Sequence, residues 1–343
     1  MPALSVLDLV PVRSDQTTGD AVAASLALAR TADELGYTRY WLAEHHNMPA
    51  VAATNPPLLI AMVAAATSRI RVGSGGVMLP NHSPLVVAEQ FALLEAAYPD
   101  RIDLGIGRAP GTDPLTRYAL RMGAGGGEDP VAQFPTYVDD IITLMSEHGA
   151  AMEVAGRRHP LRATPKAAST APVWLLGSSD YSARLAAERG LPYVFAHHFS
   201  GQGTAEALEL YRSSYRPSER FAEPRTFLTV NACVAETEEE ARRLVRPQVL
   251  QMLAIVTGGT LTPQSLVEEA EQVEIAEGQQ GIARGMMNRW VIDDAAGARA
   301  RIAELAATFG VDEVMVHPVA GSYAGTPAAA TPAREETLRL LAG

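Results

Sequence analysis

Eight apolar segments alternate with helix-like segments along the whole chain. The segments that predict strands are 4–10, 39–43, 70–79, 102–106, 173–176, 193–195, 226–234 and 313–316. Many are rich in β-branched and aromatic residues, as strands buried on both faces are. Strands that alternate with helices lie parallel in one sheet, and eight of them favour a closed (β/α)8 TIM barrel over an open sheet. We therefore expect one α/β domain over residues 1–343.

Long stretches interrupt this alternation in two places. Residues 108–130, rich in glycine and proline, follow the fourth strand, and residues 152–172 form an excursion before the fifth. Residues 256–289 follow the seventh strand and its helix. Long loops inside a compact domain usually serve function or move. We therefore predict insertions after strands 4 and 7.

Composition narrows the class of protein. The 343 residues carry a formal net charge of −11 and one cysteine, Cys233. The negative charge argues against binding nucleic acid through a general basic field, and no apolar run is long enough to span a membrane. A single cysteine excludes an intrachain disulfide and fits a reducing compartment, and no signal peptide is evident. We expect a cytoplasmic protein that binds neither nucleic acid nor membranes.

The predicted strand 39–43 leads directly into three titratable residues, Glu44, His45 and His46. Active sites of (β/α)8 barrels lie at the carboxyl ends of the strands. Because side chains alternate along a strand, Glu44 and His46 share one face and His45 points the other way. The two histidines should therefore have different roles. A buried histidine beside a surface neighbour is the alternative interpretation.

Small and polar residues join the fifth strand to its helix, namely Gly177, Ser178, Ser179 and Ser182. Hydroxyl groups and free amide groups at a helix N-terminus are suited to bind a phosphate. Arg108, which leaves the fourth strand at the same end of the barrel, could donate a charge-assisted pair of hydrogen bonds. Plain capping of the helix by Ser179 or Asp180 explains the pattern equally well.

Two adjacent glycines, Gly75 and Gly76, interrupt the third predicted strand. Glycine inside a strand indicates a bulge or the close approach of something flat. Two of them at the centre of a barrel strand favour this interpretation over mere tolerance of glycine.

Histidines recur at the predicted strand ends, as His45, His46, His197 and His198. Zinc hydrolases on barrel folds use histidines and carboxylates at such positions. Adjacent residues on a strand point apart, however, and no spaced His-x-His motif is present. We assign no metal site.

Four motifs, at residues 41–46, 72–80, 100–108 and 177–179, resemble the bacterial luciferase-like flavin-dependent monooxygenases, and the likeness continues to residue 314. The resemblance implies a (β/α)8 barrel that binds FMN in its reduced form (FMNH2), supplied by a separate flavin reductase. It also implies oxidation of a small organic substrate with O2. On this likeness His45 is the catalytic histidine, and Glu44, the acidic residue before it, is the second catalytic residue.

The resemblance also assigns the cofactor contacts. The Gly75–Gly76 bond matches a cis peptide that lies against the isoalloxazine ring. The positions that match the FMN phosphate site are Arg108, Ser178, Ser179 and Ser182. Gly107 departs from the reactive cysteine of true luciferases, and Ser178 replaces the usual acidic residue of the phosphate loop. Both departures argue against light emission from a long-chain aldehyde.

We therefore expect an FMN-dependent monooxygenase that acts on a moderately apolar organic molecule, with polyketide tailoring preferred over catabolism. The family usually forms homodimers through the early helices, which here include 58–67 and 85–97. Two alternatives stay open. One is hydride transfer with the deazaflavin F420 on the same fold, and the other is a flavin-binding barrel without turnover.

Overall fold

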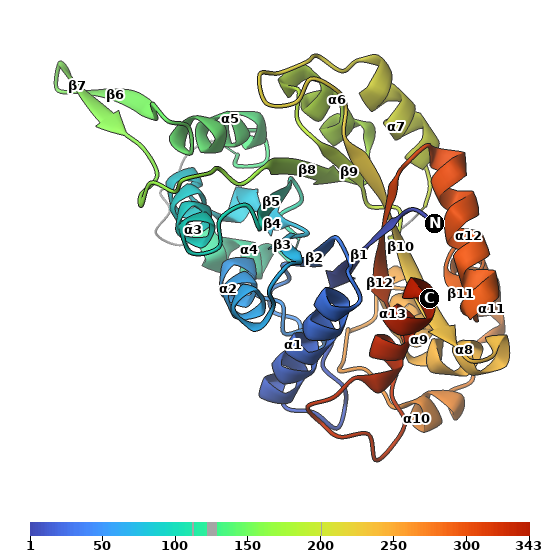
Figure 1. Cartoon of the computed structure of the whole chain (residues 1–343). Coiled ribbons are helices and arrows are strands. Elements are labelled where there is room, and N and C mark those ends of the chain that lie inside the picture. Colours follow the sequence, from blue (N-terminus) through green and yellow to red (C-terminus); the bar gives the residue numbers. More distant parts are fainter. Residues whose placement is uncertain (112, 122–128, 200) are drawn as a thin grey trace.

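The computed structural model describes residues 1–111, 113–121, 129–199 and 201–343. Eight of its parallel strands close into a barrel (Figure 1). In barrel order they are β1 (Ala3–Asp8), β2 (Arg39–Leu42), β3 (Arg71–Ser74), β5 (Ile102–Gly107), β8 (Val173–Gly177), β9 (Tyr193–Phe195), β10 (Thr226–Ala235) and β12 (Glu313–Pro318). β12 pairs with β1 and β10 pairs with β9, so the sheet closes. The predicted (β/α)8 barrel is confirmed.

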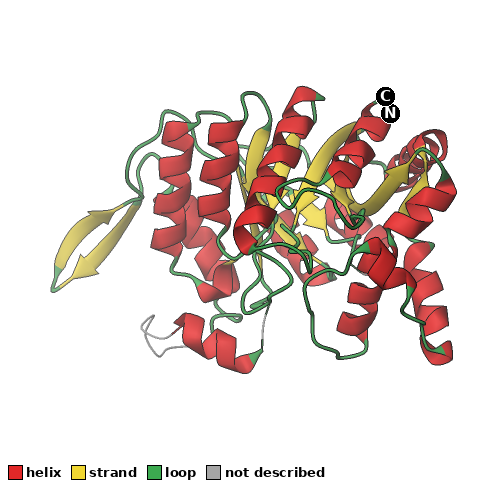
Figure 2. Ribbon diagram, turned by 90° about the horizontal axis from the view of Figure 1, so that it is seen from below, coloured by secondary structure: helices red, strands yellow, loops and turns green. Residues whose placement is uncertain are grey.

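Helices surround the strands, as the view in Figure 2 shows. They include α1 (Thr18–Glu34), α2 (Pro56–Ala66), α3 (Pro84–Ala97), α5 (Phe134–Leu144), α6 (Asp180–Arg189), α7 (Thr204–Ser213), α12 (Ala295–Phe309) and α13 (Pro332–Ala342). Local sequence sets their starts. The Asn55 side chain accepts a hydrogen bond from the Leu58 amide at the start of α2, where two prolines occupy the first turn. The largest buried apolar cluster lies between these helices and the strands.

Both predicted insertions are present. After β5 the chain forms α4 (Pro114–Arg121) and an antiparallel hairpin, β6 (Ala150–Val154) and β7 (Arg157–Leu161), that projects beyond α5 in Figure 1. Residues 112 and 122–128 of the first insertion lie outside the described residues. After β10 come α8 (Glu238–Leu244), α9 (Arg246–Val256), α10 (Val267–Glu271), α11 (Glu277–Met287) and β11 (Val291–Asp294). The strand β11 pairs in parallel with the last residues of β10, Ala232 to Ala235.

Aromatic side chains fill the barrel interior. Trp41, Trp174 and Phe227 pack edge to face or tilted, with ring centroids 5.2–5.7 Å apart. At the amino ends of the strands, next to these rings, the guanidinium of Arg39 forms ion pairs with Asp103 and Glu313. This packing leaves the carboxyl ends of the strands as the place for a site. The described part of the chain contains no helix with the length and apolar character needed to cross a bilayer.

Candidate active site

Glu44 follows β2 and anchors the first part of the site. Its side chain is almost fully buried, with 1% exposed. Its Oε1 atom accepts hydrogen bonds from His46 Nε2 and His82 Nε2, each at 2.7 Å, and Oε2 accepts one from the Met78 amide at 2.9 Å. Burial acts to raise the pKa of Glu44, but these hydrogen bonds outweigh it and lower the pKa to about 2. Glu44 is therefore ionised at neutral pH and fastens the end of β2 to β4 (Val77–Met78).

His45 lies apart from this network, as the alternation along the strand predicts. Its backbone amide donates to the Ala53 carbonyl at 2.7 Å. Its ring atom Nδ1 is buried and has no hydrogen-bond partner among the described residues. Burial lowers the pKa of His45, and nearby Glu44 opposes this effect. The imidazole is therefore neutral at neutral pH and has bonding capacity that the protein leaves unused.

The sequence analysis did not single out His82, which follows the 3-10 turn η1 (Leu79–Asn81). Glu44, His46 and His82 place ligand atoms within 4.8 Å of one another, so this cluster could hold a metal ion. Of the four histidines that the sequence analysis considered as metal ligands, this cluster contains only His46. In the structure both imidazoles donate to one oxygen of an ionised carboxylate, and we interpret the cluster as a hydrogen-bonded brace.

The bond between Gly75 and Gly76 is cis, as the family resemblance implies. The Gly75 amide donates to the Leu42 carbonyl at 2.8 Å, which places the pair beside the end of β2. A Cβ atom on Gly75 would lie 2.8 Å from Leu7 Cδ1, and one on Gly76 would lie 2.8 Å from the Gly105 carbonyl oxygen. Any larger residue would collide with the barrel wall. The expected third strand, 70–79, is accordingly divided here into β3 and β4.

Arg108 lies against the first turn of α6. Its guanidinium carbon is 4.0 Å from the centroid of the Tyr181 ring, a cation–π contact that sequence reasoning missed. Arg108 follows β5 directly, and β5 pairs with β8, which leads into α6. The structure thus brings Arg108 to the loop that was predicted to bind a phosphate.

The other members of that loop gather at the same helix end. A Cβ atom on Gly177 would lie 2.5 Å from Ser182 Oγ, so the glycine is needed for their close approach. Ser178 and Ser179 are exposed, whereas Ser182 is buried. Ser179 occupies the N-cap position, but its side chain makes no capping hydrogen bond. The capping alternative for Ser179 is therefore not supported, and the amide groups of the first turn remain available for an anion.

Two further histidines complete this end of the barrel. His198 follows β9, and its Nδ1 lies 2.8 Å from Thr229 Oγ1; His317 belongs to β12, and its Nδ1 lies 2.9 Å from Asn231 Oδ1. Their ring centroids are 6.4 Å apart. Burial, reinforced by neighbouring histidines that include His45, lowers the pKa of His198 to about 4 and that of His317 to about 3. His317 escaped notice because the last strand was expected to end at residue 316.

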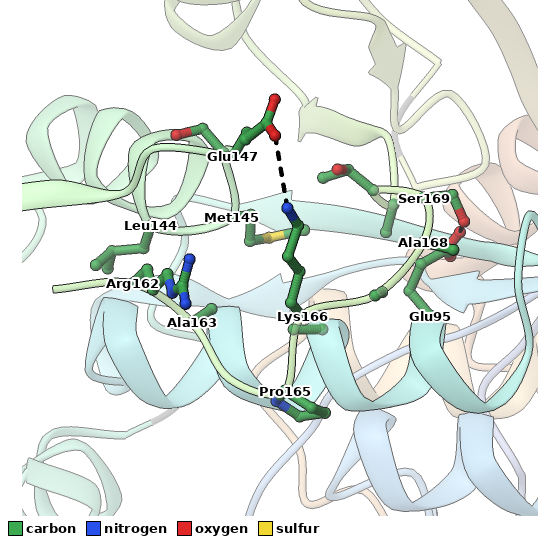
Figure 3. Close-up of a pocket in the computed structure, with 15 residues that line it drawn as sticks. Glu95, Leu144, Met145, Glu147, Arg162, Ala163, Pro165, Lys166, Ala168 and Ser169 are labelled. Carbon is green, nitrogen blue, oxygen red and sulfur yellow. Dashed lines mark hydrogen bonds and ion pairs between the residues drawn. The ribbon is translucent and has the colours of Figure 1, made fainter.

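A cavity of about 280 Å³ lies elsewhere, between α3, α5 and residues 162–171 (Figure 3). Within it, Oε1 of the buried Glu95 accepts hydrogen bonds from the Ser169 hydroxyl and the Asp100 amide. Residues 162–171 lead into the amino end of β8, the opposite end of the barrel from the histidines. None of the predicted site residues lines this cavity, so we place the site at the carboxyl ends.

The low pKa values of His198 and His317 predict that the free energy of unfolding falls as the pH drops from about 6.5. In the unfolded chain both imidazoles protonate near the model value of 6.5, whereas in the folded chain they stay neutral down to about 4 and about 3. Below pH 6.5 the unfolded state binds more protons, so stability falls by up to about 1.4 kcal/mol per pH unit for each histidine. Above this pH they add no slope. Two charged groups act on His317 in opposite directions, because Arg334 lowers its pKa and Asp8 raises it. The net pKa is still about 3, so stability still falls with falling pH.

Urea unfolding of the wild type and of His317→Asn between about pH 5 and pH 7.5 tests this prediction. The variant should show a shallower fall, and His159→Asn, at an exposed position on β7, should behave as the wild type. Parallel curves for wild type and His317→Asn would contradict the assignment.

A family model described as luciferase-like monooxygenase matches residues 3–313. The uncharacterized protein YvbT of Bacillus subtilis (strain 168) is 43% identical over 317 residues, which cover 92% of this chain and 90% of that protein. A luciferase-like monooxygenase of Escherichia coli (strain K12) is 39% identical over 315 residues, which cover 92% and 91%. The crystal structure of apo-MsnO8 has a TM-score of 0.85 and 33% identity, and the match covers 100% of this chain and 98% of that one.

More distant matches differ in what they bind. The N-acetyl-S-alkylcysteine monooxygenase of Bacillus subtilis (strain 168) is 36% identical over 245 residues, 71% of each chain. The oxygenating constituent of 3,6-diketocamphane monooxygenase from Pseudomonas putida, solved with FMN, shares the fold at 18% identity and a TM-score of 0.70, covering 100% of this chain and 97% of that one. An F420-dependent secondary alcohol dehydrogenase shares it at 14% identity and a TM-score of 0.66, covering 99% of each. Taken with the family model and the two relatives above, the matches show that this chain belongs to the luciferase-like monooxygenase family.

Proposed function

We propose that the protein is a monooxygenase that uses reduced FMN and O2 to oxidise a small, moderately apolar organic substrate, with polyketide tailoring preferred over catabolism. One observation carries the proposal. The Arg108–α6 contact, the cis Gly75–Gly76 bond and the unpartnered His45 all belong to the carboxyl ends of neighbouring strands. An anion site, a side-chain-free surface and a free imidazole are what a flavin mononucleotide enzyme needs at one place.

The residues fit FMN as follows. Arg108, Ser178, Ser179 and Ser182, with the first amide groups of α6, would hold the phosphate, and Gly177 lets Ser182 approach. Gly75 and Gly76 would present the backbone of the cis bond to the isoalloxazine ring, because their positions have no room for a side chain beside the barrel wall. When bound, reduced FMN supplies the electrons that activate O2. A separate flavin reductase is the proposed source of the reduced cofactor.

The protein side chains would do two different things in this reaction. His45 is neutral and can donate one hydrogen bond and accept another, so it can hold or transfer a proton near the reacting atoms. Glu44 keeps its charge and holds the Met78 amide and two imidazoles in place. We therefore assign His45 a catalytic role and Glu44 a positioning role.

Hydride transfer with F420 remains the second candidate, because an enzyme with that cofactor shares the fold. Its low sequence identity to this chain carries no argument about the cofactor here. The FMN proposal is favoured because relatives at 36–39% identity are named monooxygenases.

Replacing Arg108 with alanine should weaken FMN binding by about tenfold to a hundredfold. A charge-assisted contact to phosphate contributes about 1.5–3 kcal/mol, and about 1.4 kcal/mol corresponds to a factor of ten. Riboflavin lacks the phosphate, so its affinity should change far less. Fluorescence titration with both ligands measures the difference.

Lys166→Ala is the matched control, since it removes one positive charge at an exposed position outside the site. It should leave both affinities as they are. An equal loss of FMN and riboflavin binding in Arg108→Ala would show that the arginine does not read the phosphate.

We also propose a homodimer that forms through α2 and α3. These adjacent helices expose large apolar side chains, Leu58 at 65%, Met62 at 43%, Val86 at 49% and Leu93 at 59%. Burying such a patch in a partner removes apolar area from water. Light scattering at micromolar concentration should give a dimer for the wild type and a monomer for the double variant Leu58→Asp/Leu93→Asp. Ile282→Asp on α11 is the control, and a monomeric wild type would rule the dimer out.

A further inference from the structure

We propose that His198 and His317 form a substrate subsite that accepts hydrogen bonds and therefore selects molecules bearing a hydroxyl or N–H group. The inference rests on the proposed function, because it names the class of substrate for that site. Nε2 of each ring supports it, because this atom has a lone pair and no hydrogen. The hydrogen bonds around each ring decide which nitrogen bears the proton.

The tautomer of His317 follows from its partner Asn231. The Asn231 side-chain amide donates to the backbone carbonyl of His198 through Nδ2 at 2.8 Å. A carbonyl can only accept, so Nδ2 faces His198 and Oδ1 faces His317. An amide oxygen can only accept as well, so His317 Nδ1 must donate across the 2.9 Å contact. In the neutral ring Nε2 is then left with a lone pair and no hydrogen.

The same reasoning fixes His198. The Thr229 hydroxyl donates its one hydrogen to the Phe195 carbonyl at 3.1 Å. Thr229 Oγ1 must therefore accept the 2.8 Å hydrogen bond from His198 Nδ1. His198 Nε2 is likewise an acceptor. Both rings thus have the same tautomer, although different residues impose it.

Neither Nε2 atom has a hydrogen-bond partner in the described part of the chain. His198 is partly exposed and His317 is 5% exposed, whereas Nδ1 of His45 is fully buried. Both rings belong to the carboxyl-end region that carries the flavin-binding residues proposed above, and His45 lies within electrostatic range of both. Two acceptors beside a catalytic imidazole are suited to bind the reacting molecule.

Charge strengthens this selectivity. Both rings stay neutral at physiological pH, so they provide no cation for a carboxylate. A carboxylate would face two lone pairs without a donor, whereas an alcohol, phenol or N–H group would pair with one or both. Because a site that hydrogen-bonds a hydroxyl rejects the analogue lacking it, the subsite discriminates substrates of similar size and hydrophobicity.

Nuclear magnetic resonance of the full-length protein, labelled with 15N at histidine only, tests the tautomers directly. Two-bond 1H–15N spectra at about pH 7 separate protonated from unprotonated ring nitrogens. The variants His198→Gln and His317→Gln assign the signals. We expect Nδ1 protonated and Nε2 unprotonated in both rings. Protonation of Nε2 in both would overturn the inference.

Ligand discrimination is tested with 1-naphthol and 1-methoxynaphthalene, which differ by one hydroxyl hydrogen. With FMN present, 1-naphthol should bind roughly tenfold more tightly and perturb the Nε2 signals. The double variant His198→Phe/His317→Phe should lose this preference, and His197→Phe should keep it. If the double variant does not fold, the change of the Nε2 signals in the wild type on adding 1-naphthol tests the subsite instead. Equal binding of the two probes, with no change of these signals, would overturn the subsite.

These results are separable from the test of cofactor use. Correct tautomers and a naphthol preference without FMN binding would support the subsite and contradict the proposed function. Tight FMN binding with Nε2 protonated in both rings would support the proposed function and contradict the subsite.

Discussion

Replacing His45 with alanine is expected to reduce coupled substrate oxidation by about 10²–10⁴-fold, the usual scale for a lost acid or base group. Nδ1 of His45 has no hydrogen-bond partner among the described residues, so the ring is available for proton transfer. FMN affinity should stay nearly unchanged, because the proposed phosphate and ring contacts involve other residues. Hydrogen peroxide release should rise as oxidation of the flavin becomes uncoupled from oxidation of the substrate.

The measurement uses reduced FMN, O2 and an uncharged thioether that bears a hydroxyl group, because a thioether is the kind of molecule in one relative's name and the subsite proposed above selects a hydroxyl. Oxidised product and hydrogen peroxide are quantified per reduced flavin consumed. His197→Ala is the control, since Nδ1 of this histidine pairs with Thr204 outside the proposed machinery. A His45→Ala variant that retains full coupling but loses FMN would make His45 a binding residue and not a catalytic one.

Replacing Glu44 with glutamine should lower the free energy of unfolding by about 3 kcal/mol at neutral pH. The folded pKa of about 2 lies below the model value of 4.5, and the side chain is 1% exposed. Each pKa unit corresponds to about 1.4 kcal/mol, present above the unfolded pKa and lost as the pH falls through the folded pKa. The difference between wild type and variant should therefore shrink between about pH 4.5 and pH 2.

Urea unfolding at about pH 7 and about pH 3.5 measures both parts of this prediction. Glu304→Gln is the control, because its ion pair with Arg301 is at the surface and contributes little. The Glu44 variant should also lose activity, since Met78, which Glu44 holds, lies two residues after Gly76. A loss of stability no larger than that of Glu304→Gln at pH 7 would contradict the proposed brace.

Local sequence signals predicted most of the barrel. The alternation of apolar segments located all eight strands, and Gly36, with a positive φ of 79°, ends α1 as a terminal glycine does. Strand β11 was missed because only its first two residues, Val291 and Ile292, are apolar. The hairpin β6–β7 is exposed on both faces except at its ends, so it carries no period-two apolar pattern. α13 was also missed; the expected alternation ended with the strand at 313–316.

The site was predicted in part. Alternation along β2 separated His45 from the Glu44–His46 pair, and the order of strands brought Arg108 to α6. The contact of His82 with Glu44 spans 38 positions and exists only because β2 and β3 are neighbours in the closed barrel. The pairing of His317 with Asn231 likewise depends on the register between β12 and β10. Such contacts are set by the pairing and register of neighbouring strands, which single-sequence patterns do not encode.

The use of reduced FMN with O2 is tested most directly by anaerobic titration followed by rapid mixing. The protein is titrated with reduced FMN and, separately, with reduced F420, and each complex is then mixed with oxygenated buffer while the flavin absorbance is followed. We predict that the protein binds reduced FMN more tightly than reduced F420. After mixing with O2, protein-bound FMN should return to its oxidised form in two resolved phases, whereas free reduced FMN should follow a different, single course. Preferential binding of reduced F420, with reduced FMN reoxidising as it does in free solution, would contradict the assignment as an FMN-dependent monooxygenase.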